Sequence, residues 1–165
     1  MFKQCIHQIA KIEKNIEYKK YTEAFHKFDK IILLGNGGSN AIASHISEDA
    51  IKFHKKISLS FSDPSMLTCF INDYKMENAY AKFLEVHADR ESLIVLISSS
   101  GESKNMINAA KYCIKNNITY GILTGFNKNN KLRKVSKKSV FDYHINSNNY
   151  GVIECVHQIF LHAVI

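Results

Sequence analysis

The segment IILLGNGGSNAIASHISEDAIKF, residues 31–53, contains the pattern from which the fold can be predicted. It opens with a short apolar run, as a strand of a parallel sheet does when helices cover both of its faces. The glycines of residues 35–38 then allow a tight turn and the close approach of a ligand. Ser39 or Asn40 can cap a following helix, whose free N–H groups attract anions. Taken alone, this loop is as consistent with a structural turn as with a ligand site.

The same alternation of apolar run and helical segment recurs along the chain. We expect strands at residues 30–35, 57–61, 92–100, 119–125 and 139–145. We expect helices at residues 40–54, 75–88, 103–116 and 127–135, one or two more within 3–27, and a last one over 151–165. This order predicts an α/β fold, a three-layer αβα sandwich around a five-stranded parallel sheet. With one proline and no linker rich in glycine and serine, residues 1–165 are expected to form a single domain.

Composition narrows the class of protein and of partner. Of the 165 residues, 45% are apolar and 22% are charged, which is typical of a globular protein. No apolar run has the length of a membrane span and the N-terminus mixes charge with apolar residues, so we expect a cytoplasmic protein without a membrane partner. The four scattered cysteines are expected to be unpaired thiols. The net charge of +7 is spread out, and its densest part, residues 128–138, is expected to be a solvated helix face rather than a nucleic-acid site. A general positive field suits an anionic small substrate.

A second loop, ISSSGESKN at residues 97–105, follows another apolar run. Its hydroxyl groups and backbone N–H groups converge at the start of a helix, which predicts a phosphate site that needs no lysine. The alternative is a helix cap, for which one serine would be enough. The hydroxyls belong to Ser98, Ser99, Ser100 and Ser103.

Together these motifs resemble the sugar isomerase (SIS) family, and within it the phosphoheptose isomerase branch. The resemblance is carried by residues 36–39, SNAIASHISEDA at 39–50, SDPSMLTCFIND at 62–73, ISSSGESKNMINAA at 97–110, ILTG at 122–125 and IECVHQIFLHAVI at 153–165. It implies a flavodoxin-like SIS fold and an aldose–ketose isomerase that converts sedoheptulose 7-phosphate to D-glycero-D-manno-heptose 7-phosphate for lipopolysaccharide or capsule precursors. It also implies a homotetramer with shared active sites, in which residues 1–28 serve oligomerisation.

The resemblance also implies roles for individual residues. The serine loop would hold the phosphate. The sugar would be bound by Asn36, Gly37, Gly38, Ser39, Asp73 and Glu154. Proton transfer through a cis-enediol would fall to Asp49 and His162. A zinc ion would be held by His45, Asp49, Glu154 and His162.

The spacing of the implied zinc ligands is compatible with such a site. His45 and Asp49 are four residues apart and share one helix face. Glu154 and His162 are two turns apart and about 80° offset around an ideal helix. Two histidines and two carboxylates suit zinc. Without the resemblance, a histidine within an apolar helix, as His162 is, would more often be a core residue.

Four positions depart from the pattern of the family. Asp49 stands where glutamate is usual, Glu154 where glutamine is usual, Gly151 where a sugar-contacting aspartate is usual, and Asn40 where histidine is common. A shift of about 1 Å in a catalytic group can cost about 10²-fold in rate. The alternative function is therefore a non-catalytic SIS module that binds a phosphosugar or a protein partner.

Overall fold

A computed structural model describes all residues, 1–165. Its centre is a parallel sheet of five strands in the order β2-β1-β3-β4-β5. The strands are β1 (Lys30–Gly35), β2 (Ile57–Ser60), β3 (Ser92–Ser98), β4 (Thr119–Thr124) and β5 (Asp142–His144). This is the flavodoxin-like strand order, and it confirms the predicted fold class.

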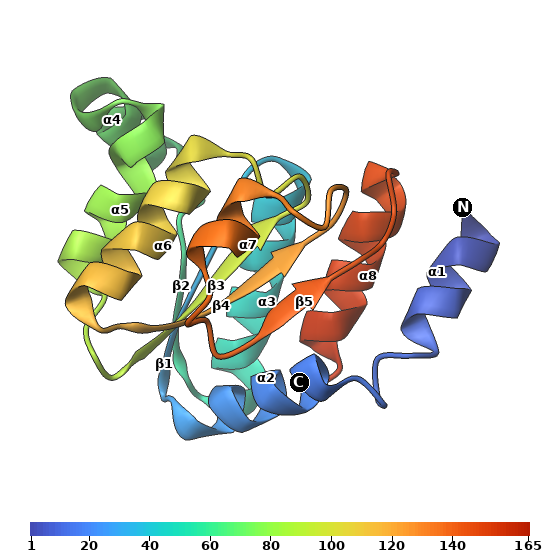
Figure 1. The fold of residues 1–165 in the computed structure, drawn as a ribbon. Helices are drawn as coiled ribbons and strands as arrows, with labels where there is room; N and C mark the ends of the chain where they lie inside the picture. The colour runs from blue at the N-terminus through green and yellow to red at the C-terminus, as the bar shows by residue number, and fades with distance from the viewer.

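Helices cover both faces of the sheet (Figure 1). The helices are α1 (Phe2–Ile9), α2 (Ile16–Lys27), α3 (Gly38–His54), α4 (Pro64–Tyr74), α5 (Met76–His87), α6 (Lys104–Asn116), α7 (Lys131–Val135) and α8 (Tyr150–His162). Helices α2, α3 and α8 share one apolar core with the sheet, whereas α5, α6 and α7 share the other. Helix α1 packs beside α8, away from the sheet. No helix is both long and apolar enough to cross a bilayer.

The alternation of side chains along the strands divides the core in two. In β1, Ile31 and Leu33 face the core under α3 and α8, whereas Ile32 and Leu34 face the core under α5 and α6. Because both faces are covered, every residue of β3 is buried, as its unbroken apolar pattern predicts.

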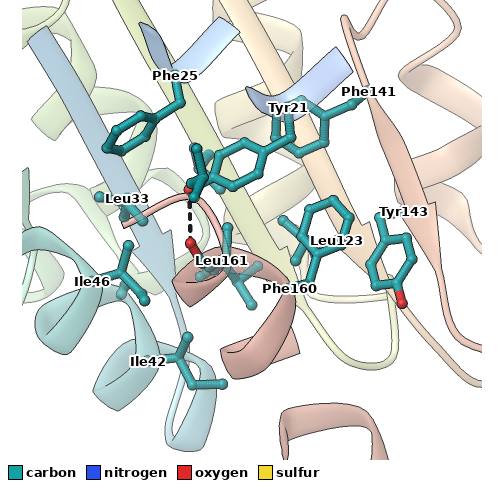
Figure 2. Packing of buried hydrophobic residues seen from close by; sticks show 14 of the residues in the cluster. Tyr21, Phe25, Leu33, Ile42, Ile46, Leu123, Phe141, Tyr143, Phe160 and Leu161 are labelled. Atoms are coloured by element: carbon teal, nitrogen blue, oxygen red, sulfur yellow. Dashed lines mark hydrogen bonds between the residues drawn. The ribbon is translucent and has the colours of Figure 1, made fainter. Parts of the chain in front are cut away.

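Helix α2 closes one side of the core that it shares with α3 and α8, where Figure 2 shows its Tyr21 and Phe25 packed beside Phe160 and Leu161. Its Tyr21 stacks on Phe160 of α8 with ring centroids 5.3 Å apart and donates a hydrogen bond of 3.4 Å to the carbonyl of Leu161. Tyr21 and Phe160 are both fully buried. The end of α8 that carries His162 is therefore held in place by the N-terminal segment.

Most expected elements are present with ends shifted by one to three residues, and the structure differs more clearly from the prediction in three places. Residues 64–74 form helix α4, although no helix was expected there. Its start is defined by Pro64 in the first turn and by the Asp63 cap, which accepts a hydrogen bond of 2.8 Å from Met66 N. Helix α7 begins only at residue 131, because Asn130 is its cap. Strand β5 is reduced to three residues, since only these pair with β4.

Candidate functional site

The first loop joins β1 to α3 at the carboxyl edge of the sheet. Gly37 caps α3 with φ +54° and ψ −123°, a conformation that side chains rarely allow. A Cβ at Gly38 would lie 2.5 Å from the Glu154 Oε2 atom. Glycine at residue 38 therefore lets the Glu154 carboxylate of α8 lie against the first turn of α3, where the helix dipole favours a negative charge.

Two residues from α5 and α6, the helices on the other face of the sheet, hold this loop through hydrogen bonds. Tyr80 Oη of α5 is 2.8 Å from Asn36 Oδ1 and also donates to the Gly35 carbonyl. Burial raises the pKa of Tyr80 to about 12, so its hydroxyl stays protonated as a donor. Asn105 of α6 and Asn36 exchange hydrogen bonds of 2.8 and 3.1 Å between their side-chain amides. Sequence reasoning missed Tyr80 and Asn105, because a tyrosine and an asparagine within helices give no local signal of a role in a distant loop.

The serine loop that follows β3 contains two kinds of hydroxyl. Ser98 Oγ accepts a hydrogen bond from Gly101 N at 3.2 Å, and Ser100 Oγ accepts one from Glu102 N at 3.2 Å, so these two shape the loop. Ser99 Oγ has no partner although its residue is only 5% exposed, and Ser103 caps α6 without a side-chain hydrogen bond. The last two hydroxyls are therefore free to bind a ligand.

Both loops line one pocket. It has a volume of about 140 Å³, and its polar lining consists of Asn36, Ser39, Ser98, Ser99, Ser100, Ser103 and Tyr150. The pocket brings together most residues that the sequence predicted for a phosphosugar. We call it the serine cradle. A dianionic phosphate fits this lining, because hydroxyl donors and the start of α6 surround the space.

A second group of predicted residues meets between α3 and α8. Asp49 Oδ2 lies 3.3 Å from His45 Nε2 and 3.3 Å from His162 Nε2, and the two imidazole rings are 4.8 Å apart. Asp49 is 8% exposed, while both histidines remain partly open to solvent. We call these three residues the histidine cluster.

The histidine cluster could hold a metal ion. Its three potential ligand atoms lie within 4.8 Å of one another. Two atoms that bind one zinc ion tetrahedrally at about 2.0 Å are about 3.3 Å apart, which matches both contacts of Asp49. Although the side chain of Asp49 is one methylene shorter than that of glutamate, its carboxylate contacts both imidazoles.

Gln158 supports the cluster and was not predicted from sequence. Its Nε2 atom lies 3.0 Å from His45 Nδ1, on the side of the ring opposite Asp49. A side-chain amide can donate to that nitrogen or accept from it, so Gln158 can stabilise either tautomer of His45. Contacts of this kind orient metal-binding histidines.

Helix α8 is anchored to the sheet by a different histidine. His157 is fully buried and its Nε2–H donates to the carbonyl of Thr124 at the end of β4, at 3.2 Å. Burial lowers the pKa of His157 to about 3, so the imidazole is neutral. This contact joins α8, which also carries Glu154 and His162, to the end of β4.

Among the predicted residues with polar side chains, two lie apart from both groups. Asp73 is exposed on α4, where it accepts a hydrogen bond of 3.6 Å from Cys69 Sγ, and it does not line the serine cradle. Glu154, predicted as a fourth metal ligand, lies against Gly38 and is not one of the three clustered residues.

Comparisons with known proteins place this geometry in a family. No protein-family model matches the sequence. The chain is 30% identical over 153 residues to the phosphoheptose isomerase of Fusobacterium nucleatum, a match that covers 89% of this chain and 76% of that protein. The phosphoheptose isomerase GmhA of Neisseria gonorrhoeae superposes with a TM-score of 0.86 at 25% identity, over 99% of this chain and 92% of the other. The sugar isomerase domain of the RpiR transcription factor from Sphaerobacter thermophilus has the same fold, with a TM-score of 0.65 at 13% identity over 99% and 86% of the two chains.

The match extends over the fold and over both loops at the carboxyl edge of the sheet. The superposition on the gonococcal protein covers 99% of this chain, so it spans the backbone segments that carry the serine cradle and the histidine cluster. The chain belongs to the phosphoheptose isomerase family.

Proposed function

We propose that the protein is an aldose–ketose isomerase that converts sedoheptulose 7-phosphate to D-glycero-D-manno-heptose 7-phosphate, a precursor for lipopolysaccharide or capsule. The observation that carries the proposal is the Asp49 carboxylate, which is buried between the imidazoles of His45 and His162, in a chain whose serine cradle can receive a phosphate. One group can fix a phosphate while the other moves protons.

In this reaction the cradle binds the phosphate through Ser99 and Ser103, whose hydroxyls have no partner inside the protein. Asp49 removes the proton from the carbon next to the carbonyl, which gives a cis-enediolate, and the remaining hydroxyl proton passes from one enediolate oxygen to the other. His162 returns a proton to the neighbouring carbon. The contact of 3.3 Å between Asp49 Oδ2 and His162 Nε2 allows the two groups to exchange that proton after each turnover.

The histidine cluster would also hold zinc through His45, Asp49 and His162, with Glu154 as the proposed fourth ligand. When bound, zinc stabilises negative charge on the enediolate oxygens. Glu154 would need to turn from Gly38 toward the cluster to bind it.

We further propose that the protein is a homotetramer joined through residues 1–28. Helix α1 buries none of its residues, and Phe2 and Ile6 are 78% and 65% exposed. Asp73, exposed on α4, would then contact the sugar from a neighbouring subunit. Light scattering tests the assembly, and a monomer at micromolar concentration contradicts it.

The test of function is an isomerase assay on sedoheptulose 7-phosphate, with added zinc and with a chelator. We expect turnover that zinc raises and the chelator lowers. Protein that never converts this sugar, with or without zinc, refutes the isomerase.

The second candidate is a non-catalytic module that binds a phosphosugar or a protein partner. It is favoured by Asp49 and Gly151, which stand where the resemblance implies a glutamate and an aspartate, and by the sugar isomerase domain of a transcription factor with the same fold. Calorimetric binding of sedoheptulose 7-phosphate without turnover, at saturating zinc, would identify this case.

A further inference from the structure

The side-chain amide of Asn36 lies where two pockets meet. Asn36 lines the serine cradle, and it also lines an adjoining pocket of about 580 Å³. A ligand that fills the cradle therefore reaches this residue. An asparagine amide presents either an acceptor oxygen or a donor N–H group, so the direction in which it points decides which ligand atom it can bind.

The direction of the Asn36 amide follows from a chain of hydrogen bonds that begins at the backbone of α6. Met106 N lies 3.0 Å from one terminal atom of Asn105, and because a backbone N–H can only donate, that atom is the oxygen, Oδ1. Asn105 Nδ2 therefore faces Asn36 and donates to its Oδ1 atom at 2.8 Å. Asn36 Nδ2 returns a hydrogen bond of 3.1 Å to Asn105 Oδ1.

This pairing leaves the Asn36 amide with one free group, and that group is a donor. Its oxygen already has two neighbours, Asn105 Nδ2 and Tyr80 Oη. Its nitrogen carries two hydrogens, of which only one is used within the protein. Because Asn105 is only 3% exposed, little water competes for the pairing. The second N–H of Asn36 is therefore available to a ligand.

Tyr80 favours the opposite direction of the amide. Its hydroxyl has one hydrogen but faces two acceptors, the Gly35 carbonyl and Asn36 Oδ1. If the amide were reversed, Tyr80 could donate to Gly35 and accept from Asn36 Nδ2, so both contacts would be hydrogen bonds. Asn105 opposes this reversal, because the reversed amide would place two nitrogen donors against each other.

We propose that Asn105 is a positioning residue, which holds the Asn36 amide against the preference of Tyr80 so that Asn36 donates its free N–H to an oxygen of the bound sugar phosphate. The inference rests on the proposed function, because it concerns the site of the same ligand. A donor suits this ligand, since its phosphate and its enediolate both carry negative charge. A reversed amide would turn a carbonyl oxygen toward these charges instead.

Asn105→Leu tests this role, because leucine keeps a branched side chain but removes both hydrogen bonds to Asn36. Tyr80 should then reverse the amide. Since about one neutral hydrogen bond decides between the two directions, the affinity for sedoheptulose 7-phosphate should fall about threefold to tenfold in calorimetric titrations. Titration with orthophosphate identifies the acceptor: an equal loss indicates a phosphate oxygen, and a loss confined to the sugar phosphate indicates a sugar oxygen.

The decisive measurement is a rescue by a second substitution. Without the hydroxyl of Tyr80 nothing favours the reversed amide, so Tyr80→Phe introduced into Asn105→Leu should restore the affinity to within about twofold of the wild type. Tyr80→Phe alone should cost less affinity than Asn105→Leu, because Asn105 still fixes the amide. If Asn105→Leu does not fold, Asn105→Ala provides the same single and double variants with a smaller side chain.

Asn108→Leu is the matched control. Asn108 lies about one turn further along α6, where its Nδ2 atom donates to the carbonyl of Glu77 at 2.9 Å, and it lines neither pocket. The substitution removes a contact between an α6 asparagine and α5 without disturbing Asn36. The affinity for sedoheptulose 7-phosphate should therefore stay at the wild-type value.

The outcomes separate the positioning role from other roles and from the proposed function. Unchanged affinity in Asn105→Leu overturns the inference. Asn105 also lines the adjoining pocket, so a loss that Tyr80→Phe fails to restore would mean that Asn105 binds the ligand directly or only supports the loop, and this overturns the inference as well. In both cases turnover by the wild-type protein leaves the isomerase intact. If the wild-type protein binds neither ligand, both proposals fail.

Discussion

The serine cradle and the histidine cluster are built in different ways. The cradle comes from two loops, each of which directly follows a strand and carries its polar groups within a few residues. The cluster joins α3 to α8, whose residues 49 and 162 are far apart in the chain. A loop site depends on local turns, whereas a cluster between helices depends on how those helices are held.

The largest expected effect is on the cluster. His162→Ala removes the proposed proton donor, so kcat/KM for sedoheptulose 7-phosphate should fall by about 10²–10⁴. Steady-state assays measure the change, and His26→Ala on the exposed surface of α2 controls for the loss of a histidine. Phosphate affinity should stay the same, because His162 does not line the cradle. An active His162→Ala protein would remove the cluster from the reaction.

The next prediction concerns what holds α8 in place. His157 has a pKa of about 3 in the folded protein, against 6.5 for an ordinary histidine. Between these values the unfolded chain binds a proton that the folded protein does not, so stability is complete above pH 6.5 and falls as the pH drops toward 3. At pH 5 this group should cost about 2 kcal/mol of unfolding free energy.

His157→Gln removes that dependence. Urea unfolding at pH 7 and pH 5 should show a loss on acidification that is about 2 kcal/mol smaller in the variant than in the wild type. The variant should be less stable at pH 7, because it disturbs the contact with Thr124. Equal losses in both proteins would show that the buried imidazole does not set the acid limit of α8.

The next prediction tests the serine cradle through Ser103, whose hydroxyl forms no hydrogen bond to α6. Ser103→Ala should weaken phosphate binding about tenfold, since a hydrogen bond to a charged group contributes about 1.5–3 kcal/mol. Its effect on stability should be small, because Ser103 Oγ makes no capping bond. Asp63→Ala is the opposite control: it removes a real cap of α4, so it should cost about 1 kcal/mol of stability and leave phosphate binding intact.

The smallest expected effect concerns the affinity of the histidine cluster for zinc. Gln158→Leu should weaken zinc binding about tenfold, because loss of a hydrogen bond to a metal-binding histidine typically costs 10–100-fold in affinity. Competition with a chromogenic chelator measures this directly. Gln158→Glu keeps an acceptor for His45 Nδ1–H and should retain the affinity. A leucine variant with wild-type affinity would show that Asp49 alone orients His45.

Much of the fold and of the cradle could be predicted from sequence. The strands were recognised because unbroken apolar runs such as residues 93–97 pack on both faces. The serines that line the cradle could be predicted to lie together, because they stand within a few residues of one another at a helix start. Helix α4 was missed, since its mixed sequence is defined mainly by its cap and Pro64.

The sequence by itself determined the five-stranded α/β fold, the two loops at its carboxyl edge and the resemblance to phosphoheptose isomerases. Only the tertiary structure decided that Asp49 contacts both imidazoles, that Glu154 lies against Gly38, and that Asn105 pairs with the amide of Asn36. The physical reason is the separation along the chain of the residues that determine each feature. Turns and strands follow from neighbouring residues, whereas contacts between helices depend on the packing of side chains that are distant in the chain.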